Sequence, residues 1–176
     1  MSKPFIFIEE NNHYQFDFSH AIWATDQLHE IFCEGGLSEL SDVDFIAELP
    51  NEIIFLEYKN ASIPESVSHE NYRKPFNPFQ DEKLNNIIRK FYDSYIYLTG
   101  QNKIKPVKYV YILEYPHSDS VTRGEVRNRL VKRLPFALQK LPEIENRLID
   151  SFEVLSIEEW NRHQIYHQFP ITLITE

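Results

Sequence analysis

Apolar and polar residues alternate along this chain with two different periods, and the period in each stretch predicts its secondary structure. Two short alternating stretches, residues 5–9 and 14–18, flank a turn-forming Asn-Asn pair and predict a β-hairpin. A helix is expected to begin at Ser19, which can cap its first turn, and to run to about Glu34 before a Gly-Gly pair. The N-terminal part of the chain is therefore expected to hold a hairpin followed by a helix.

After this helix, strands are predicted where short runs are rich in β-branched and aromatic residues. The expected strands cover residues 42–49, 52–59, 107–114 and 152–155. Pro50-Asn51 joins the first two as a turn, and the three prolines within residues 60–78 predict a loop.

The helices expected in the same part of the chain have recognisable ends. They run from about Phe79 to Leu98, from a capping box of Thr122 and Glu125 to a break at Pro135, and from a second capping box of Ser156 and Glu159 around Trp160. Helices and strands thus follow one another in the order helix, strand, strand, helix, strand, helix, strand, helix. This order predicts a mixed α/β domain.

Composition narrows the classes of protein that remain. The 176 residues suit one domain, and 42% hydrophobic residues are too many for a disordered chain. Cys33 is the only cysteine, which excludes a disulfide framework and a cysteine zinc site and fits a reducing compartment. No apolar stretch has membrane length and no signal-peptide pattern opens the chain. We therefore expect a cytoplasmic protein without a membrane partner.

The hairpin over residues 42–59 carries the candidate chemistry. With Pro50-Asn51 as a two-residue turn, Asp44 lies directly across from Glu57, and Asp42 across from Lys59. Asp44, Glu57 and Lys59 then share one face of the sheet. The other face collects the apolar residues Val43, Phe45, Ala47, Leu49, Ile54, Leu56 and Tyr58. A slip of one residue would destroy this sorting, so the apolar face supports the register independently.

Two carboxylates that face each other across a ladder repel and destabilise the sheet. A divalent cation bound between Asp44 and Glu57 would remove the conflict, and hard oxygen ligands suit Mg²⁺, with Mn²⁺ as a substitute. Lys59 could orient or deprotonate an attacking water, or stabilise charge in the transition state. A solvated strand end is the alternative interpretation of the same residues, since a Glu-x-Lys tripeptide arises readily by chance.

At this hairpin the sequence resembles the PD-(D/E)xK nuclease superfamily. Asp44 matches the lone Asp of the motif, although Val43 replaces the proline before it, and Glu57-Tyr58-Lys59 matches the E-x-K at the end of an apolar strand. The spacing of 13 residues between Asp44 and Glu57 is the one that Holliday junction resolvases of this superfamily use.

The resemblance implies a restriction-endonuclease-like core over about residues 20–115, a central mixed sheet flanked by helices, with a C-terminal helical extension over about 121–176. The family usually has a strand between the first helix and the Asp strand, and residues 37–41 are very short for one. The N-terminal hairpin is expected to substitute for it. Many members also use an acid from the leading helix, for which Glu30 is preferred over Asp26 and Glu34. A solvated helix face is an equally good reading of Glu30.

The net charge of −9 counts against non-specific nucleic-acid binding over the whole surface, so a nuclease would need its positive charge concentrated. The helix after Thr122 offers that concentration in Arg123, Arg127, Arg129, Lys132 and Arg133. A solvated face is the alternative for this helix.

The residues and the resemblance together predict a metal-dependent nuclease that hydrolyses DNA phosphodiester bonds. The competing class is a catalytically inactive nuclease-fold module that binds a protein or nucleic acid, which the acidic charge favours. A homodimer or another protein partner remains open.

Overall fold

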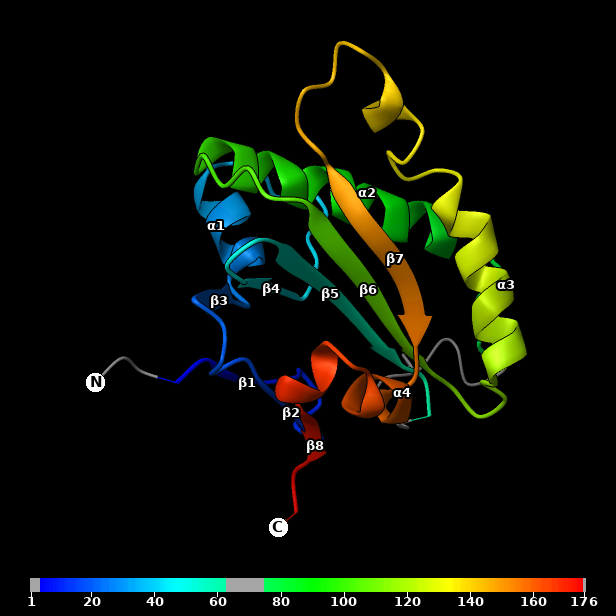
Figure 1. The fold of residues 1–176 in the computed structure, drawn as a ribbon. Coiled ribbons are helices and arrows are strands. Elements are labelled where there is room, and N and C mark those ends of the chain that lie inside the picture. Colours follow the sequence, from blue (N-terminus) through cyan, green and yellow to red (C-terminus); the bar gives the residue numbers. More distant parts are fainter. Residues whose placement is uncertain (1–3, 63–74, 176) are drawn as a thin grey trace.

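The structure is a computed structural model that describes residues 4–62 and 75–175 (Figure 1). Its strands are β1 (Ile6–Ile8), β2 (Tyr14–Asp17), β3 (Trp23–Thr25), β4 (Phe45–Glu48), β5 (Ile53–Asn60), β6 (Val107–Glu114), β7 (Ile149–Leu155) and β8 (Ile171–Leu173). Its helices are α1 (Leu28–Glu34), α2 (Asp81–Gly100), α3 (Ser120–Val131) and α4 (Ile157–Arg162), with the short 3-10 helices η3 (Leu138–Lys140) and η4 (Tyr166–Gln168). The expected mixed α/β class is confirmed.

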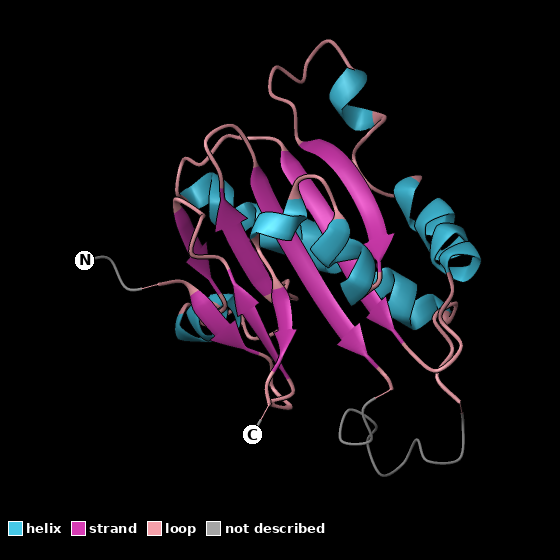
Figure 2. Cartoon of the chain, turned by 60° about the horizontal axis from the view of Figure 1, so that its bottom comes forward, coloured by secondary structure: helices cyan, strands magenta, loops and turns pink. Residues whose placement is uncertain are grey.

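The strands form two sheets. The larger sheet has the order β3-β4-β5-β6-β7, with antiparallel pairs from β3 to β5 and parallel pairs from β5 to β7. The smaller sheet, β1-β2-β8, is antiparallel throughout. Parallel neighbours need a crossover connection. α2 lies in the crossover from β5 to β6, and α3 lies in the crossover from β6 to β7. Figure 2 shows its strands side by side.

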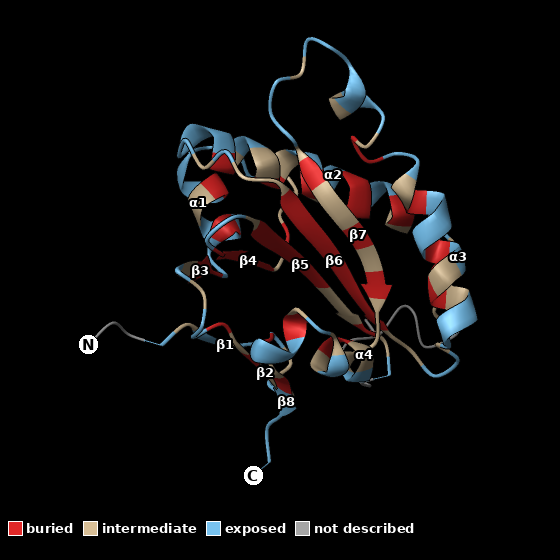
Figure 3. Ribbon diagram, in the orientation of Figure 1, coloured by how far each residue is buried: buried red, intermediate tan, exposed pale blue. Residues whose placement is uncertain are grey.

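The larger sheet is buried on both faces because two apolar clusters cover it. One cluster joins alternate strand residues such as Phe55 to α1, α2 and α3, and Phe91 of α2 packs against Phe55 within it. The other joins the intervening residues, such as Leu56, to the smaller sheet and to Trp160 of α4. Figure 1 shows α2 behind the strands and α4 in front, and Figure 3 shows β5 and β6 buried over most of their length. A polar side chain on these strands therefore meets protein rather than solvent, unless it lies near a strand end.

The predicted register of the central hairpin is confirmed. β4 and β5 pair with Glu48 opposite Ile53, as a turn at Pro50-Asn51 requires, and Leu49 N donates to Glu52 O at 2.8 Å. The alternation of large apolar residues on both faces fixes this register, because a slip would place charged residues in both clusters.

Four further predictions agree with the structure. The N-terminal hairpin forms between β1 and β2, α2 covers nearly the expected range, and β6 has the bounds predicted for it. Ser156 and Glu159 form the predicted capping box at the start of α4. Each of these elements has a strong local signal, either a sustained hydrophobic period or a specific cap.

The first predicted helix is wrong over its N-terminal half. Residues 23–25 form β3, which pairs with β4, and α1 begins only at Leu28. Trp23 and Thr25 favour strands, and pairing along the free edge of β4 gives their backbone hydrogen bonds. β3 pairs along the edge of β4, but it precedes α1 in the chain, whereas the strand that the resemblance implies would follow the first helix. The N-terminal hairpin was expected to replace that strand, but it pairs with β8 in the smaller sheet.

Two expectations for the C-terminal part are also corrected. Asp119, rather than Thr122, caps α3, and its carboxylate accepts from Thr122 N at 2.7 Å. α3 ends at Val131, before Pro135. Residues 121–176 are not a purely helical extension, because β7 joins the larger sheet and β8 joins the smaller one. The C-terminal part therefore completes both sheets.

Among the helices of residues 4–62 and 75–175, none combines the length and the apolar character needed to cross a membrane.

Candidate active site

Asp44 and Glu57 come together on the face of the larger sheet that α2 covers, although the ladder of β4 and β5 begins one residue after Asp44, with Phe45 opposite Leu56. Glu57 belongs to β5, and Asp44 comes directly before β4. Asp44 Oδ2 accepts a hydrogen bond from Tyr58 N at 2.7 Å, which fixes its carboxylate beside β5. Val43 was expected on the opposite face, but it packs with the cluster under α2 and its N–H donates to Ser94 Oγ. The chain before β4 has therefore left the regular strand alternation.

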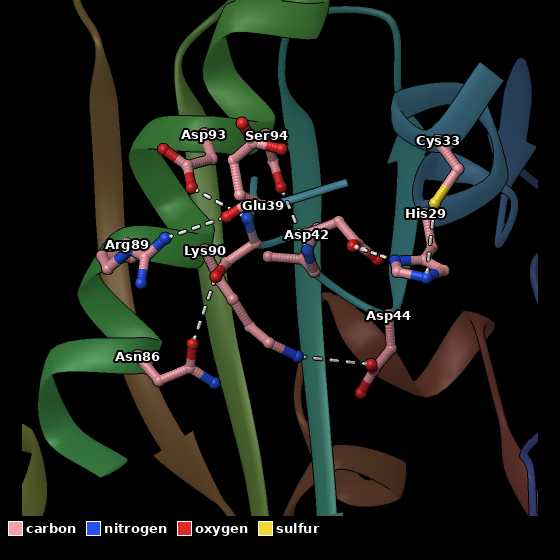
Figure 4. A network of polar contacts seen from close by, with 12 residues as sticks. His29, Cys33, Glu39, Asp42, Asp44, Asn86, Arg89, Lys90, Asp93 and Ser94 are labelled. Carbon is pink, nitrogen blue, oxygen red and sulfur yellow. Dashed lines mark hydrogen bonds and ion pairs between the residues drawn. The ribbon is translucent and has the colours of Figure 1, made fainter. Parts of the chain in front are cut away.

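Lys90 of α2 links the two carboxylates. Its Nζ donates to both oxygens of Glu57 at 2.7 Å and lies 3.6 Å from Asp44 Oδ1. Figure 4 shows the Lys90 side chain extending from the helix toward Asp44. Lys90 was not among the site residues expected from the sequence. Its position beside the apolar stripe of α2 was the available signal, because a lysine is rarely buried unless it has an acidic partner.

The electrostatics of this cluster are those of a site with too few positive charges. Burial, followed by the Asp44 carboxylate, raises the pKa of Glu57 to about 8, although Lys90 acts in the opposite direction. Burial also raises the pKa of Asp44. Burial alone would lower the pKa of Lys90, but the charges of Glu57 and Asp44 raise it above its usual range. One ammonium therefore offsets the repulsion of the two carboxylates only in part.

Lys59 lies two residues beyond Glu57 on the same strand, but it does not contact the carboxylates. Within residues 4–62 and 75–175, no ion pair or hydrogen bond involves its ammonium. Burial, followed by the charge of Lys59, lowers the pKa of Lys83 in the first turns of α2. Lys59 and Lys83 are thus positive charges that act on each other near the C-terminal end of β5.

Asp42 was expected opposite Lys59, and the structure gives it a different partner. Its Oδ1 lies 3.2 Å from Nδ1 of His29, and His29 Nε2 lies 3.7 Å from Cys33 Sγ. Figure 4 shows this chain of contacts running from Asp42 to α1. The charge of Asp42 also acts on Asp44, Glu57 and Lys90. His29 of α1 therefore contacts Asp42 and not the acidic pair itself.

Glu30 does not join the site in this structure. Its side chain is exposed on α1, and its charge, after burial, contributes to the raised pKa of Asp26. Glu30 is adjacent to His29 in sequence, so it points from a different side of the short helix. A solvated helix face accounts for its position.

The basic residues around α3 are largely engaged within the protein. Arg123 is buried, and its guanidinium forms hydrogen bonds of 2.9–3.0 Å with both oxygens of Glu159. Arg127 donates to Phe152 O, Arg129 pairs with Glu125, and Arg133 donates to Asn85. Lys132 is exposed. Arg123 is thus removed from the surface on which phosphate contact was expected, and the structure does not gather these five residues into one free patch.

The donor set of the pair suits a hard cation, because Mg²⁺ often binds through one or two carboxylates plus phosphate and water. Asp44 and Glu57 could supply those two carboxylates. No group of three or more His, Cys, Asp or Glu side chains that could hold a metal occurs among the residues described. A metal at this place would therefore depend on oxygen atoms from water or substrate.

Comparisons of the chain with protein-family models, with curated proteins and with solved structures find no match.

Proposed function

We propose that this protein is a metal-dependent nuclease that hydrolyses DNA phosphodiester bonds, with Asp44 and Glu57 as ligands of Mg²⁺ or Mn²⁺. One observation carries the proposal: two buried or half-buried carboxylates meet beside a single ammonium, although like charges repel. A protein retains such a conflict most readily where function requires it. Asp44 before β4, Glu57 and Lys59 on β5, and the α2 crossover to a parallel β6 also suit a restriction-endonuclease-like core.

A bound divalent ion would polarise the phosphodiester and lower the pKa of an attacking water. The protein side chains then have separate tasks. Asp44 and Glu57 would hold the ion, and the hydrogen bond from Tyr58 N orients the Asp44 carboxylate. The Lys59 ammonium, which no described group engages, is free to bind a phosphate oxygen or to hold the charge that develops on it. Burial under α2 keeps water other than the nucleophile away from Glu57.

A non-catalytic module with the same fold is the second candidate, and Lys90 favours it. Because the Lys90 ammonium already binds both carboxylates, the cluster can hold β4, β5 and α2 together without any metal. The net charge of −9 and the engaged arginines of α3 also suit a protein partner better than a nucleic acid.

Incubation with supercoiled plasmid, linear duplex, single-stranded and branched DNA, each with Mg²⁺ and with Mn²⁺, tests the proposal. We expect metal-dependent cleavage of at least one substrate, and its loss in Asp44→Asn, Glu57→Gln and Lys59→Ala. Glu48→Gln is the matched control, since Glu48 lies on the same sheet face but pairs with Lys103 and Lys105. Absence of cleavage on all four substrates with either metal, from folded wild-type protein, would establish the non-catalytic module.

A further inference from the structure

Lys90 occupies the place that a metal ion would need between the two carboxylates. Its Nζ is equidistant, at 2.7 Å, from the two oxygens of Glu57, so it lies on the open side of that carboxylate. Its 3.6 Å distance to Asp44 places it on the side where the two carboxylates converge. Mg²⁺ binds carboxylate oxygens at about 2.1 Å. An ion that used both residues would overlap the ammonium or lie against it, with strong like-charge repulsion.

We infer that Lys90 is a displaceable counter-ion, which keeps the Asp44–Glu57 pair closed to metal until a phosphodiester enters with the ion. This inference rests on the proposed function, because it assumes that the pair is the metal site. Under this inference, Lys90 of α2 controls when the Asp44–Glu57 pair binds a metal ion.

The charges explain why substrate should enter with the metal. When both carboxylates are ionised, two carboxylates and one ammonium leave one negative charge at the site. A divalent ion would turn this into one positive charge, beside a lysine that has lost its partner. A phosphodiester carries one negative charge, so the complex of site, metal and substrate is neutral, and the released ammonium gains a phosphate oxygen in place of Glu57. By thermodynamic linkage, metal and phosphodiester then strengthen each other's binding.

The exposure of the three side chains shows where the exchange can take place. Glu57 is 9% exposed, Lys90 17% and Asp44 36%. Solvent therefore reaches the cluster from the side of Asp44, while Glu57 forms its closed end. The Lys90 side chain is long and flexible, so its ammonium can leave Glu57 without movement of the α2 backbone.

Calorimetric titration of the full chain with Mn²⁺ tests the displacement. We expect weak binding to the wild type and at least about tenfold tighter binding to Lys90→Met, because removal of a close charge is worth that much or more. Lys83→Met is the matched control, since Lys83 lies on the same helix and contacts no described carboxylate. An equal Mn²⁺ affinity in all three proteins would overturn the inference.

A pair of oligonucleotide probes tests the role of the phosphate charge. A phosphorothioate oligothymidylate is charged and resists hydrolysis, whereas a methylphosphonate of the same length is neutral. We expect the charged oligomer to raise the Mn²⁺ affinity of the wild type several-fold, the neutral oligomer to leave it unchanged, and Lys90→Met to lose most of this effect. The same increase in wild type and Lys90→Met would contradict the counter-ion role.

Lys90→Met leaves two carboxylates without a partner, so a measurement on the wild type guards against a failure to fold. Side-chain ¹H–¹⁵N NMR reports on the Lys90 ammonium, whose signal is identified by its loss in Lys90→Arg. Mg²⁺ together with the phosphorothioate oligomer should shift this signal, and Mg²⁺ alone should shift it much less. A signal that stays in place while metal binds would refute displacement.

The proposed nuclease function can fail separately from this inference. Tighter Mn²⁺ binding to Lys90→Met, together with no cleavage by the wild type, would support the counter-ion role of Lys90 and contradict the nuclease function. Cleavage by the wild type, together with an unchanged metal affinity in Lys90→Met, would support the nuclease function and contradict the counter-ion role.

Discussion

The central hairpin carries a buried acidic group at each end of the same face, and the two ends differ in how they are neutralised. At the turn end, Glu48 binds two lysines that follow α2, Lys103 and Lys105. At the other end, Asp44 and Glu57 share Lys90 alone. Hydrogen bonds from Lys103 and Lys105 lower the pKa of Glu48, whereas burial and Asp44 raise the pKa of Glu57 to about 8.

The balance of charge distinguishes a structural ion pair from a candidate site in this fold. The cluster at Glu48 has more positive than negative charge and stabilises the ionised carboxylate. The cluster at Glu57 has the opposite balance and destabilises it, so it has capacity for a further cation. The two ends differ in burial as well as in the ratio of lysines to carboxylates, because burial is the first cause of the raised pKa of Glu57, whereas hydrogen bonds from two lysines are the first cause of the lowered pKa of Glu48. Repulsion between neighbouring carboxylates is expected at positions where the residue type is required for function and not for stability.

The largest expected effect is on catalysis. Glu57→Gln should lower metal-dependent cleavage at least about a hundredfold, because it removes a ligand and a charge from the reacting site. Glu48→Gln should change the rate only slightly, once both variants are shown to be folded. Initial rates of plasmid nicking measure the contrast. Similar losses in both variants would mean that the two ends of the hairpin do not differ in function.

The next effect is on stability in the absence of metal. Lys90→Met should lower the free energy of unfolding by about 3 kcal/mol, because it leaves two carboxylates without a buried partner. Lys103→Met should lower it less, since Glu48 keeps Lys105. Urea unfolding at neutral pH compares them. Addition of Glu57→Gln to Lys90→Met should restore part of the loss, and no restoration would show that Lys90 stabilises the fold through packing instead.

Glu48 predicts a pH dependence of definite sign. Its pKa is lower in the folded protein than in the unfolded chain, so its stabilisation is present above the unfolded value and is lost as pH falls through the folded value. Glu48→Gln should therefore lower the free energy of unfolding by about 2 kcal/mol at pH 7 and by little in acid. Unfolding of wild type and variant between pH 7 and pH 3 gives the difference. A constant difference over this range would contradict the ionic origin of the stabilisation.

The smallest expected effect concerns Asp44. Opposed carboxylates alone predict that Asp44→Asn stabilises the metal-free protein, and Lys90 reduces the gain because it already offsets part of the repulsion. Asparagine can also accept the hydrogen bond from Tyr58 N. We expect a gain of about 0.5 kcal/mol, which thermal unfolding with a chelator present can detect. A clear loss of stability would mean that attraction to Lys90 outweighs repulsion by Glu57.

Residues with a strong local pattern determined much of the fold. The alternation through β4 and β5 fixes their register from Phe45–Leu56 to Glu48–Ile53, because strand side chains have a period of two, and Asp44 lies one residue before this ladder. The apolar period of residues 84–98 fixes α2, and Ser156 with Glu159 fixes the start of α4. In segments with a weak local pattern, strand pairing determined the secondary structure instead. Residues 23–25 became β3 because β4 offered them a free edge.

The tertiary structure alone decided what neutralises the acidic pair. Lys90 is 33 residues from Glu57, and the sequence period shows only that it lies near the edge of the buried stripe of α2. The rotation and position of α2 on the sheet determine that its ammonium meets these carboxylates. The same long-range packing takes Arg123 from the expected phosphate-binding surface and buries it against Glu159. Sequence period fixes which face a side chain occupies, but a contact between distant elements depends on how those faces pack.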